Sequence, residues 1–128
     1  MSVELDLELA GDLPLIEPSD SLWWRAGATD TRAVDLVQAR YGFAPTSWIH
    51  FRFRAGEIDA QLDEMATLVS TVLAASDGDA LLHADFEDVW LLRREGRLVL
   101  SDDDARWPPR RRAGLGEVTR APLDARPF

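Results

Sequence analysis

Residues 79–101, with the sequence DALLHADFEDVWLLRREGRLVLS, decide the predicted fold. They contain three short apolar runs of strand length, separated by turn sequences, at about residues 79–84, 88–94 and 97–101. Glu95-Gly96 is typical of a two-residue hairpin turn because Gly adopts positive φ readily, and residues 85–88 form the preceding turn. Three consecutive strands joined by short turns predict an antiparallel meander, and therefore an α+β fold.

Two further segments alternate apolar and polar side chains, as a strand with one buried face does. They are residues 2–9, where leucines alternate with acids, and residues 46–54, where large apolar residues alternate with Trp, His and Arg. Residues 10–21 contain Gly and Pro among polar residues and predict a loop. The segment 22–25 is compatible with a short edge strand or with a loop anchored by its two tryptophans.

Two segments predict helices. Residues 29–42 begin with side chains suited to capping a helix and end at Gly42, which tolerates the left-handed conformation. Residues 58–75 carry apolar residues at steps of three and four, the spacing of one helix face. The predicted architecture is a mainly antiparallel sheet of about five strands with two helices packed on one face.

We expect residues 1–104 to form a single α+β domain and residues 105–128 an Arg- and Pro-rich C-terminal tail. The prolines and glycines that follow Asp102 argue against regular structure there. Residues 1–104 contain 21 acids and eight arginines, a net charge of −13, whereas residues 105–128 contain two acids and six arginines, a net charge of +4. We therefore expect the arginines of the tail to fold back onto the carboxylates of the body.

The overall composition excludes several classes of function. The chain has 128 residues, a net charge of −9 and no cysteine, so it has no disulfide, no thiol nucleophile and no zinc site built on sulfur. An acidic body disfavours nucleic-acid binding and favours a basic protein as partner. No apolar run reaches the ~20 residues that a membrane span needs, and the N-terminus does not resemble a signal peptide. We expect a cytoplasmic protein that does not bind a membrane.

Candidate catalytic residues are few. His50 and His83 lie in predicted strands without a partner motif, and we interpret both as ordinary sheet residues. The alternative is a small hydrolase that uses His50 or His83 with a carboxylate. The acidic strand face of Glu4, Asp6 and Glu8 would suit a metal ion or a basic partner, but pairing with the polar face of residues 50–54 is the favoured interpretation. We expect neither a metal nor a cofactor.

Candidate partner-binding residues are exposed acids at turns and one aromatic on a polar strand face, since tryptophan is enriched at interfaces. They are Trp48, Asp85, Glu87, Asp88, Asp102, Asp103 and Asp104.

Two segments, GDALL at residues 78–82 and LLRREGRLVL at residues 91–100, carry most of a resemblance that extends over roughly the first 100 residues. With the opening VELDLELA at residues 3–10 and the strand WIHFRFR at residues 48–54, they are similar to the immunity proteins of the myxobacterial swarm-inhibition toxin systems. The resemblance implies a non-enzymatic protein that binds and neutralises a cognate toxin in the cytoplasm of the producing cell. It implies no catalytic residues. A protein-interaction or chaperone module for a secreted partner is a further alternative.

Overall fold

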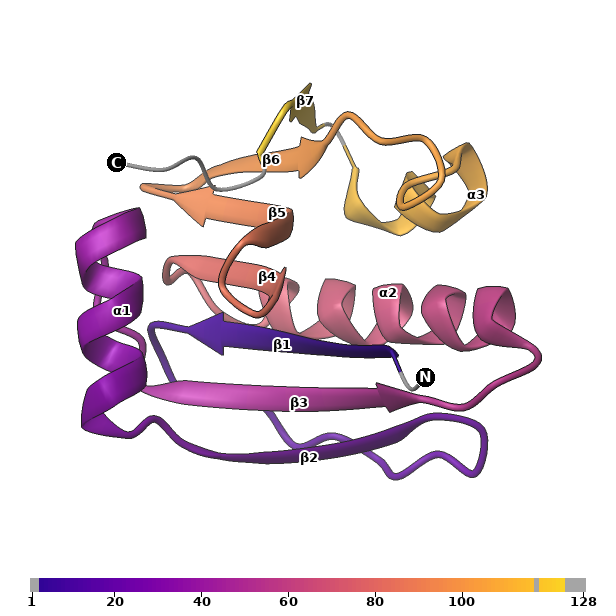
Figure 1. Cartoon of the computed structure of the whole chain (residues 1–128), viewed down its shortest axis with the longest axis horizontal. Helices are drawn as coiled ribbons and strands as arrows, with labels where there is room; N and C mark the ends of the chain where they lie inside the picture. Colours follow the sequence, from indigo (N-terminus) through magenta and orange to yellow (C-terminus); the bar gives the residue numbers. More distant parts are fainter. Residues whose placement is uncertain (1–2, 117, 124–128) are drawn as a thin grey trace.

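The computed structural model describes residues 3–116 and 118–123 of the chain, and within them one sheet of seven strands dominates. The strands lie in the order β2-β3-β1-β4-β5-β6-β7 (Figure 1). Their bounds are Val3–Leu9 for β1, Trp23–Ala28 for β2, Ser47–Phe53 for β3, Ala80–Ala84 for β4, Asp88–Arg94 for β5, Arg97–Ser101 for β6 and Thr119–Ala121 for β7. All neighbouring strands are antiparallel except β6 and β7, which are parallel.

The same residues form three α-helices and a 3₁₀ turn, namely α1 (Thr31–Tyr41), α2 (Ile58–Ala74), α3 (Pro109–Arg112) and η1 (Ala113–Leu115). The predicted α+β class and the mainly antiparallel sheet are confirmed, but the predicted counts of about five strands and two helices are too low. β2 settles the segment that the sequence left open, and α3 and β7 were missed. None of the helices in the described residues is long and apolar enough to cross a membrane.

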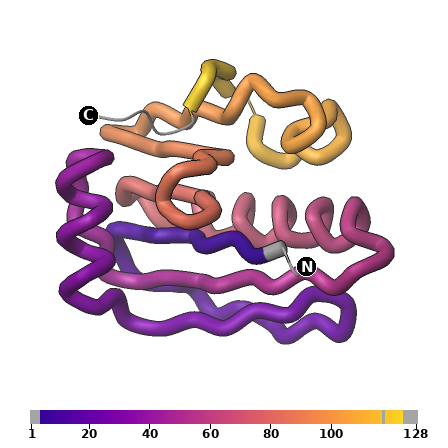
Figure 2. The backbone as a smooth tube through the Cα atoms, in the orientation of Figure 1, coloured from indigo at the N-terminus to yellow at the C-terminus, as the bar shows by residue number. Residues whose placement is uncertain are grey.

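The N-terminal strand β1 lies in the middle of the sheet, between β3 and β4 (Figure 2). Its leucines are fully buried on one face, where they meet the inward side of β3 and the apolar stripe of α2. We call this the α2 face; its members include Leu5, Leu7, Leu9, Ile49, Phe51, Phe53, Met65 and Val69. The strand alternation and the helical spacing predicted from the sequence are both confirmed.

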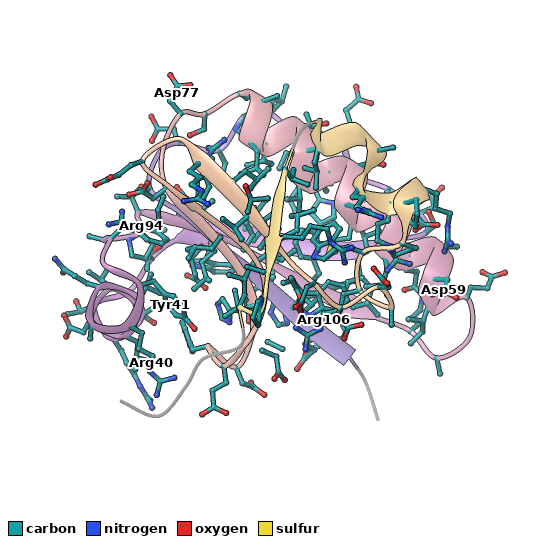
Figure 3. All side chains as sticks on the ribbon, turned by 90° about the horizontal axis from the view of Figure 1, so that it is seen from above. Arg40, Tyr41, Asp59, Asp77, Arg94 and Arg106 are labelled. Atoms are coloured by element: carbon teal, nitrogen blue, oxygen red, sulfur yellow. The ribbon has the colours of Figure 1, made fainter. Side chains whose placement is uncertain are left out.

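The helix α1 packs on the opposite face of the sheet. Its only buried residue, Val37, clusters with Leu81 and Val89, whereas Leu82 belongs to the cluster under α2. Successive residues of a strand point to opposite faces, so the two helices cover different faces, as Figure 3 shows from above. The prediction that both helices pack on one face is wrong, because helical periodicity identifies the buried side of a helix but not the sheet face that it covers. We call the face under α1 the α1 face.

Local signals at helix and turn boundaries behave as the sequence predicts. The Asp30 carboxylate accepts a hydrogen bond of 2.8 Å from the Ala33 amide and caps α1, which ends at Gly42 with φ 82°. The hairpin between β5 and β6 closes through Glu95 and Gly96, with φ of 53° and 81°. Both the predicted cap and the predicted two-residue turn are confirmed.

The β3–α2 connection is held without a conventional cap. Glu57, the residue before α2, has a left-handed φ of 48° and makes no capping side-chain hydrogen bond. The buried Gln61 amide takes over: it accepts from the Arg54 amide at 2.9 Å and donates to the Arg54 carbonyl at 3.0 Å. This pairing satisfies the backbone amide and carbonyl of Arg54, the residue that follows the end of β3, and so fixes the start of the connection to α2.

The prediction of no regular structure after Asp102 is wrong. Trp107 is fully buried among the residues of the α2 face, and its indole Nε1 donates to the Trp90 carbonyl at 2.7 Å. A β-bulge at Trp90 prepares this contact: Leu91 pairs with Leu82 and Val89 pairs with His83, so Trp90 is the extra residue. Its ring then meets that of Trp107 edge-on at 6.1 Å. Helix α3 has four residues and β7 three. Elements this short show no hydrophobic periodicity from which the sequence could predict them.

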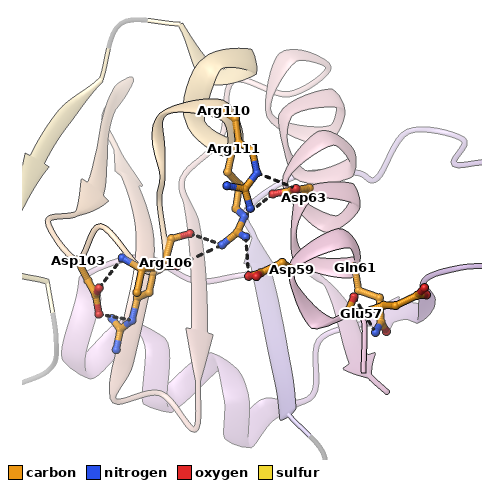
Figure 4. Close-up of polar contacts among 9 residues, drawn as sticks. Glu57, Asp59, Gln61, Asp63, Asp103, Arg106, Arg110 and Arg111 are labelled. Carbon is orange, nitrogen blue, oxygen red and sulfur yellow. Dashed lines mark hydrogen bonds and ion pairs between the residues drawn. The ribbon is translucent and has the colours of Figure 1, made fainter. Parts of the chain in front are cut away.

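Arginines after residue 104 bind carboxylates of the preceding chain, as predicted (Figure 4). The Arg111 side chain is fully buried, and its Nε donates to Asp63 of α2 at 2.7 Å while Nη1 donates to the Arg106 carbonyl at 2.7 Å. Arg110 donates to the other Asp63 oxygen at 3.1 Å, and Arg120 pairs with Asp104 at 2.8 Å. The division of the chain at residue 104 stays a prediction, and residues 124–128 of that tail lie outside the described residues.

Replacing Trp107 with Ala should lower the free energy of unfolding by about 3 to 5 kcal/mol. The substitution removes a fully buried indole and leaves the Trp90 carbonyl without its donor. Urea denaturation followed by circular dichroism measures the change. The matched control is Trp23→Ala, whose side chain is 42% exposed and should cost about 1 kcal/mol at most. Equal losses in the two variants would contradict the role of Trp107 in the core.

The Asp63–arginine contacts should make stability depend on pH. Burial raises the pKa of Asp63, but hydrogen bonds from Arg111 and Arg110 outweigh it and hold that pKa below its ordinary value of 3.8. A carboxyl whose pKa is lower in the folded state stabilises the fold above its unfolded pKa, and loses this contribution as pH falls through its folded pKa. Asp63→Asn should therefore be less stable than the native chain near pH 7, with the gap closing below about pH 4. A gap in urea midpoints that stays constant down to about pH 3 would contradict this.

Candidate functional site

The turn between β4 and β5 has an unusual backbone. The Glu87 amide donates to the Ala84 carbonyl at 3.1 Å and closes a four-residue turn. Its two central residues, Asp85 and Phe86, have φ of 53° and 61°, as in the type I′ turns of hairpins. Asp tolerates this region, but for a bulky residue such as Phe it stores strain on the order of 1–3 kcal/mol. Such a conformation persists only where the surroundings hold it.

Phe86 is held on three sides. Its ring stacks on His83, with ring centroids 4.3 Å apart and planes 23° from parallel. Its amide donates to His83 Nδ1 at 2.8 Å. Its carbonyl accepts a hydrogen bond of 2.7 Å from the Tyr41 hydroxyl of α1; Arg40 and Tyr41 are labelled on that helix in Figure 3. The strained turn is therefore fixed by the sheet beneath it and by α1 beside it.

His83 connects the turn to the central strand β1. The ring is fully buried, and its Nε2 lies 2.9 Å from Glu8 Oε2, a carboxylate that is only 4% exposed. Because Nδ1 accepts from the Phe86 amide, the proton of the neutral imidazole lies on Nε2, which donates to Glu8. Each partner satisfies a buried polar group of the other, which would otherwise be costly to bury.

The acids around this turn face outward. Asp85, Glu87 and Asp88 are all exposed, and within residues 3–116 and 118–123 no Arg or His forms an ion pair with them. We call this set the acidic turn. Their positions on a backbone that is fixed from two sides make the acidic turn a preorganised anionic surface.

The acids at residues 102–104 are exposed but largely engaged within the chain. Asp103 caps the following turn, where its Oδ1 accepts from the Ala105 amide at 2.9 Å, and it pairs with Arg106 at 3.6 Å. Asp104 pairs with Arg120 at 2.8 Å. The structure therefore gives Asp103 and Asp104 a local structural role, and contact of residues 102–104 with a partner stays a prediction.

Trp48, the aromatic predicted as an anchor, lies flat on the neighbouring edge strand. Its Nε1 donates to the Ala28 carbonyl at 2.8 Å, and a Cβ added to Gly27 would lie 2.8 Å from Trp48 Cζ2. Gly27 is thus the residue that makes room for the indole. The register places Gly27 opposite Trp48, and this packing explains the aromatic on a polar strand face without invoking a partner protein. Contact of the half-buried ring with a partner stays a prediction.

The polar face of β1 pairs with β3 as the favoured interpretation predicts, with one exception. His50 lies between two acids, 2.6 Å from Asp6 and 3.3 Å from Glu4. Glu4 also accepts from Arg52 at 3.2 Å, and hydrogen bonds from Arg52 and His50 lower the pKa of Glu4 below its usual value. The exception is Glu8, for which the sequence predicted a partner on β3 and which instead bonds to His83 of β4.

The hydrolase alternative gains no support from this geometry. The ring nitrogens of His50 and His83 all contact a carboxylate or a backbone amide within the fold. Five cavities among the described residues have neither histidine in their walls. Among residues 3–116 and 118–123, no three His, Asp or Glu side chains converge to hold a metal ion.

The SitI3-like family model matches residues 15–111, about three quarters of the chain. The chain belongs to the SitI3-like family. This match confirms the resemblance to swarm-inhibition immunity proteins that the sequence indicated. The matched range includes the acidic turn, Trp107 and the buried Arg111, whereas the central strand β1 lies before it. No curated protein and no solved structure matches the chain significantly.

Replacing His83 with Leu should lower the free energy of unfolding by about 3 to 5 kcal/mol, the usual cost of removing one partner of a buried polar pair. Glu8 would lose its buried donor and the Phe86 amide its acceptor. The double variant Glu8→Leu with His83→Leu removes both groups, and should recover part of that loss. Urea denaturation gives the energies, and hydrogen exchange of the Phe86 amide reports on the turn. A double variant less stable than His83→Leu alone would contradict the pairing.

Proposed function

We propose that the protein is an immunity protein that binds a cognate toxin and neutralises it without catalysis, in the cytoplasm of the cell that produces both. Membership in the SitI3-like family carries the proposal. The arrangement of the histidines supports binding rather than hydrolysis, because their ring nitrogens already have partners inside the fold. Neutralisation then follows from occupying the surface that the toxin needs.

We place the main contact at the acidic turn. Its three carboxylates are exposed, and their backbone is held by His83 and Tyr41, so little conformational freedom is lost on binding. Carboxylates without an ion-pair partner in the described residues attract cations, which favours a basic toxin surface. Electrostatic attraction of this kind accelerates encounter, and close charge pairs that lose their water strengthen the complex.

The other predicted contacts lie outside the acidic turn, on β3 and after β6. Asp102 is exposed, whereas Asp103 and Asp104 already pair with Arg106 and Arg120. A toxin cation would have to displace these arginines, so we expect charge reversal at residues 102–104 to weaken binding less than reversal at the acidic turn. Trp48 offers a half-buried indole whose hydrogen bond to Ala28 fixes its orientation.

Co-expression with the product of the adjacent upstream gene tests the function itself. If that product is the toxin, a bacterial host should grow only when this chain is also made, and the two proteins should co-purify. The toxin alone should arrest growth. Absence of both complex and rescue would refute an immunity function for this pair.

Charge reversal tests the docking surface. The triple variant Asp85→Arg, Glu87→Arg, Asp88→Arg should weaken toxin binding about 100-fold or more, since each lost charge pair contributes on the order of 1.5 kcal/mol or more. Isothermal titration calorimetry or surface plasmon resonance measures the loss, which should shrink at high salt. The matched control reverses three exposed acids of the loop before β2: Asp12, Glu17 and Asp20. Equal affinities of the two variants would place the interface elsewhere.

A further inference from the structure

Strand β2 forms an open end of the sheet. It pairs with β3 from Trp23 opposite Arg52 to Ala28 opposite Ser47, and no strand of the described residues pairs with its other side. An end strand leaves alternate backbone amides and carbonyls without partners, and so presents a template for another strand. Four of its six residues are exposed. The Trp48 indole lies over Gly27 and donates to the Ala28 carbonyl, so the open part of the edge is the segment from Trp23 to Ala26.

Positive charge gathers at this edge of an otherwise acidic body. Three of the eight arginines of residues 1–104 are exposed here, namely Arg25, Arg52 and Arg54. Arg25 lies over the Trp48 ring at 5.7 Å and Arg52 over the Trp23 ring at 4.8 Å. Arg52 pairs with Glu4, whereas Arg25 has no ion-pair partner among the described residues. The edge therefore favours an anionic neighbour.

The chain itself shows which strand such a surface accepts. On the other side of β3, the strand β1 alternates leucines with acids, and it sets Glu4 and Asp6 against Arg52 and His50 on the α1 face. Arg25 lies opposite His50 in the register of β2 and β3, so it projects from that same face. A strand added outside β2 would place its acids beside Arg25 in the manner that β1 places its acids beside His50.

A cavity at the start of β2 adds an apolar contact. It has a volume of about 450 Å³, and its walls include Leu22, Trp23 and Trp24. Arg52, Arg54 and Asp20 also line it, so two cations face one carboxylate. Trp23 is 42% exposed. Exposed tryptophan and arginine are the residue types that contribute most at protein interfaces, so the end of an added strand would find both an apolar wall and two cations here.

We propose that the outer edge of β2 is a docking site for an extended segment of a partner protein in which acidic residues alternate with β-branched apolar residues. The segment adds an eighth strand to the sheet. Its backbone bonds to the open side of β2, its acids lie beside Arg25, and its apolar residues lie on the α2 face, beside Trp24 and Ala26. The site differs from the acidic turn in both position and charge.

A synthetic peptide of about eight residues with alternating Glu and Val tests the proposal. It should bind the full chain in isothermal titration calorimetry and change the tryptophan fluorescence. The same peptide with Lys in place of Glu should bind at least about tenfold more weakly, and a peptide N-methylated at alternate amides should not bind, since it cannot form the backbone ladder. Failure of the Glu peptide to bind, or equal binding of the Glu and Lys peptides, would overturn the proposal.

Substitution in the chain locates the site. Arg25→Glu should weaken binding of the Glu peptide about tenfold or more, whereas Arg32→Glu, the same change at an exposed arginine of α1, should leave it unchanged. Circular dichroism confirms that both variants fold. Equal affinities of the two variants would overturn the proposal. So would sedimentation that shows a dimer dissociated by the peptide, because the edge would then belong to a second copy of the chain.

Discussion

The division of β1 into a leucine face and an acidic face is the constraint on which the rest of the structure depends. The strand lies in the middle of the sheet, so its acids cannot all reach water. Glu8 is almost fully buried and needs a donor, which His83 supplies. Glu4 and Asp6 lie nearer the open end, where Arg52 and His50 meet them. His83 thus follows from the burial of Glu8, because a buried carboxylate without a partner would cost several kcal/mol. Arg52 and His50 pair with acids that stay partly exposed.

On the α2 face, arginines after residue 104 likewise pair with carboxylates. Arg111 carries a charge into a fully buried site, where Asp63 and backbone carbonyls satisfy its donors, and Trp107 closes the core that α2 leaves open. The net charge of −9 is therefore unevenly distributed. Asp63 on α2 and Asp103 and Asp104 after β6 pair with arginines. The acids of the acidic turn form no ion pair among the described residues, which gives that turn a negative local field.

The sequence was sufficient wherever one element carries its own periodic signal. The alternation of β1 and the spacing of α2 predicted both elements, and Glu95-Gly96 predicted its turn. The sequence was insufficient wherever a side chain's contacts depend on the register between strands. Glu8 meets His83 only because β4 pairs with β1, and Trp48 lies flat only because Gly27 is opposite. The acidic turn was identified by its composition, but its rigidity rests on contacts from α1, whose sheet face no periodicity reveals.

The strain at Phe86 links the buried pair to the proposed surface. A bulky side chain at positive φ costs on the order of 1–3 kcal/mol, and a glycine there would remove that cost. It would also remove the ring that stacks on His83 and restore the freedom that rigid presentation eliminates. Phe86 therefore combines backbone strain with a turn whose backbone is held in place, and rigidity of this kind would favour the proposed docking by reducing the entropy lost on binding. The acidic turn and the β2 edge then form two surface patches of opposite charge on one sheet. A partner that carries a complementary patch for each can dock in only one orientation.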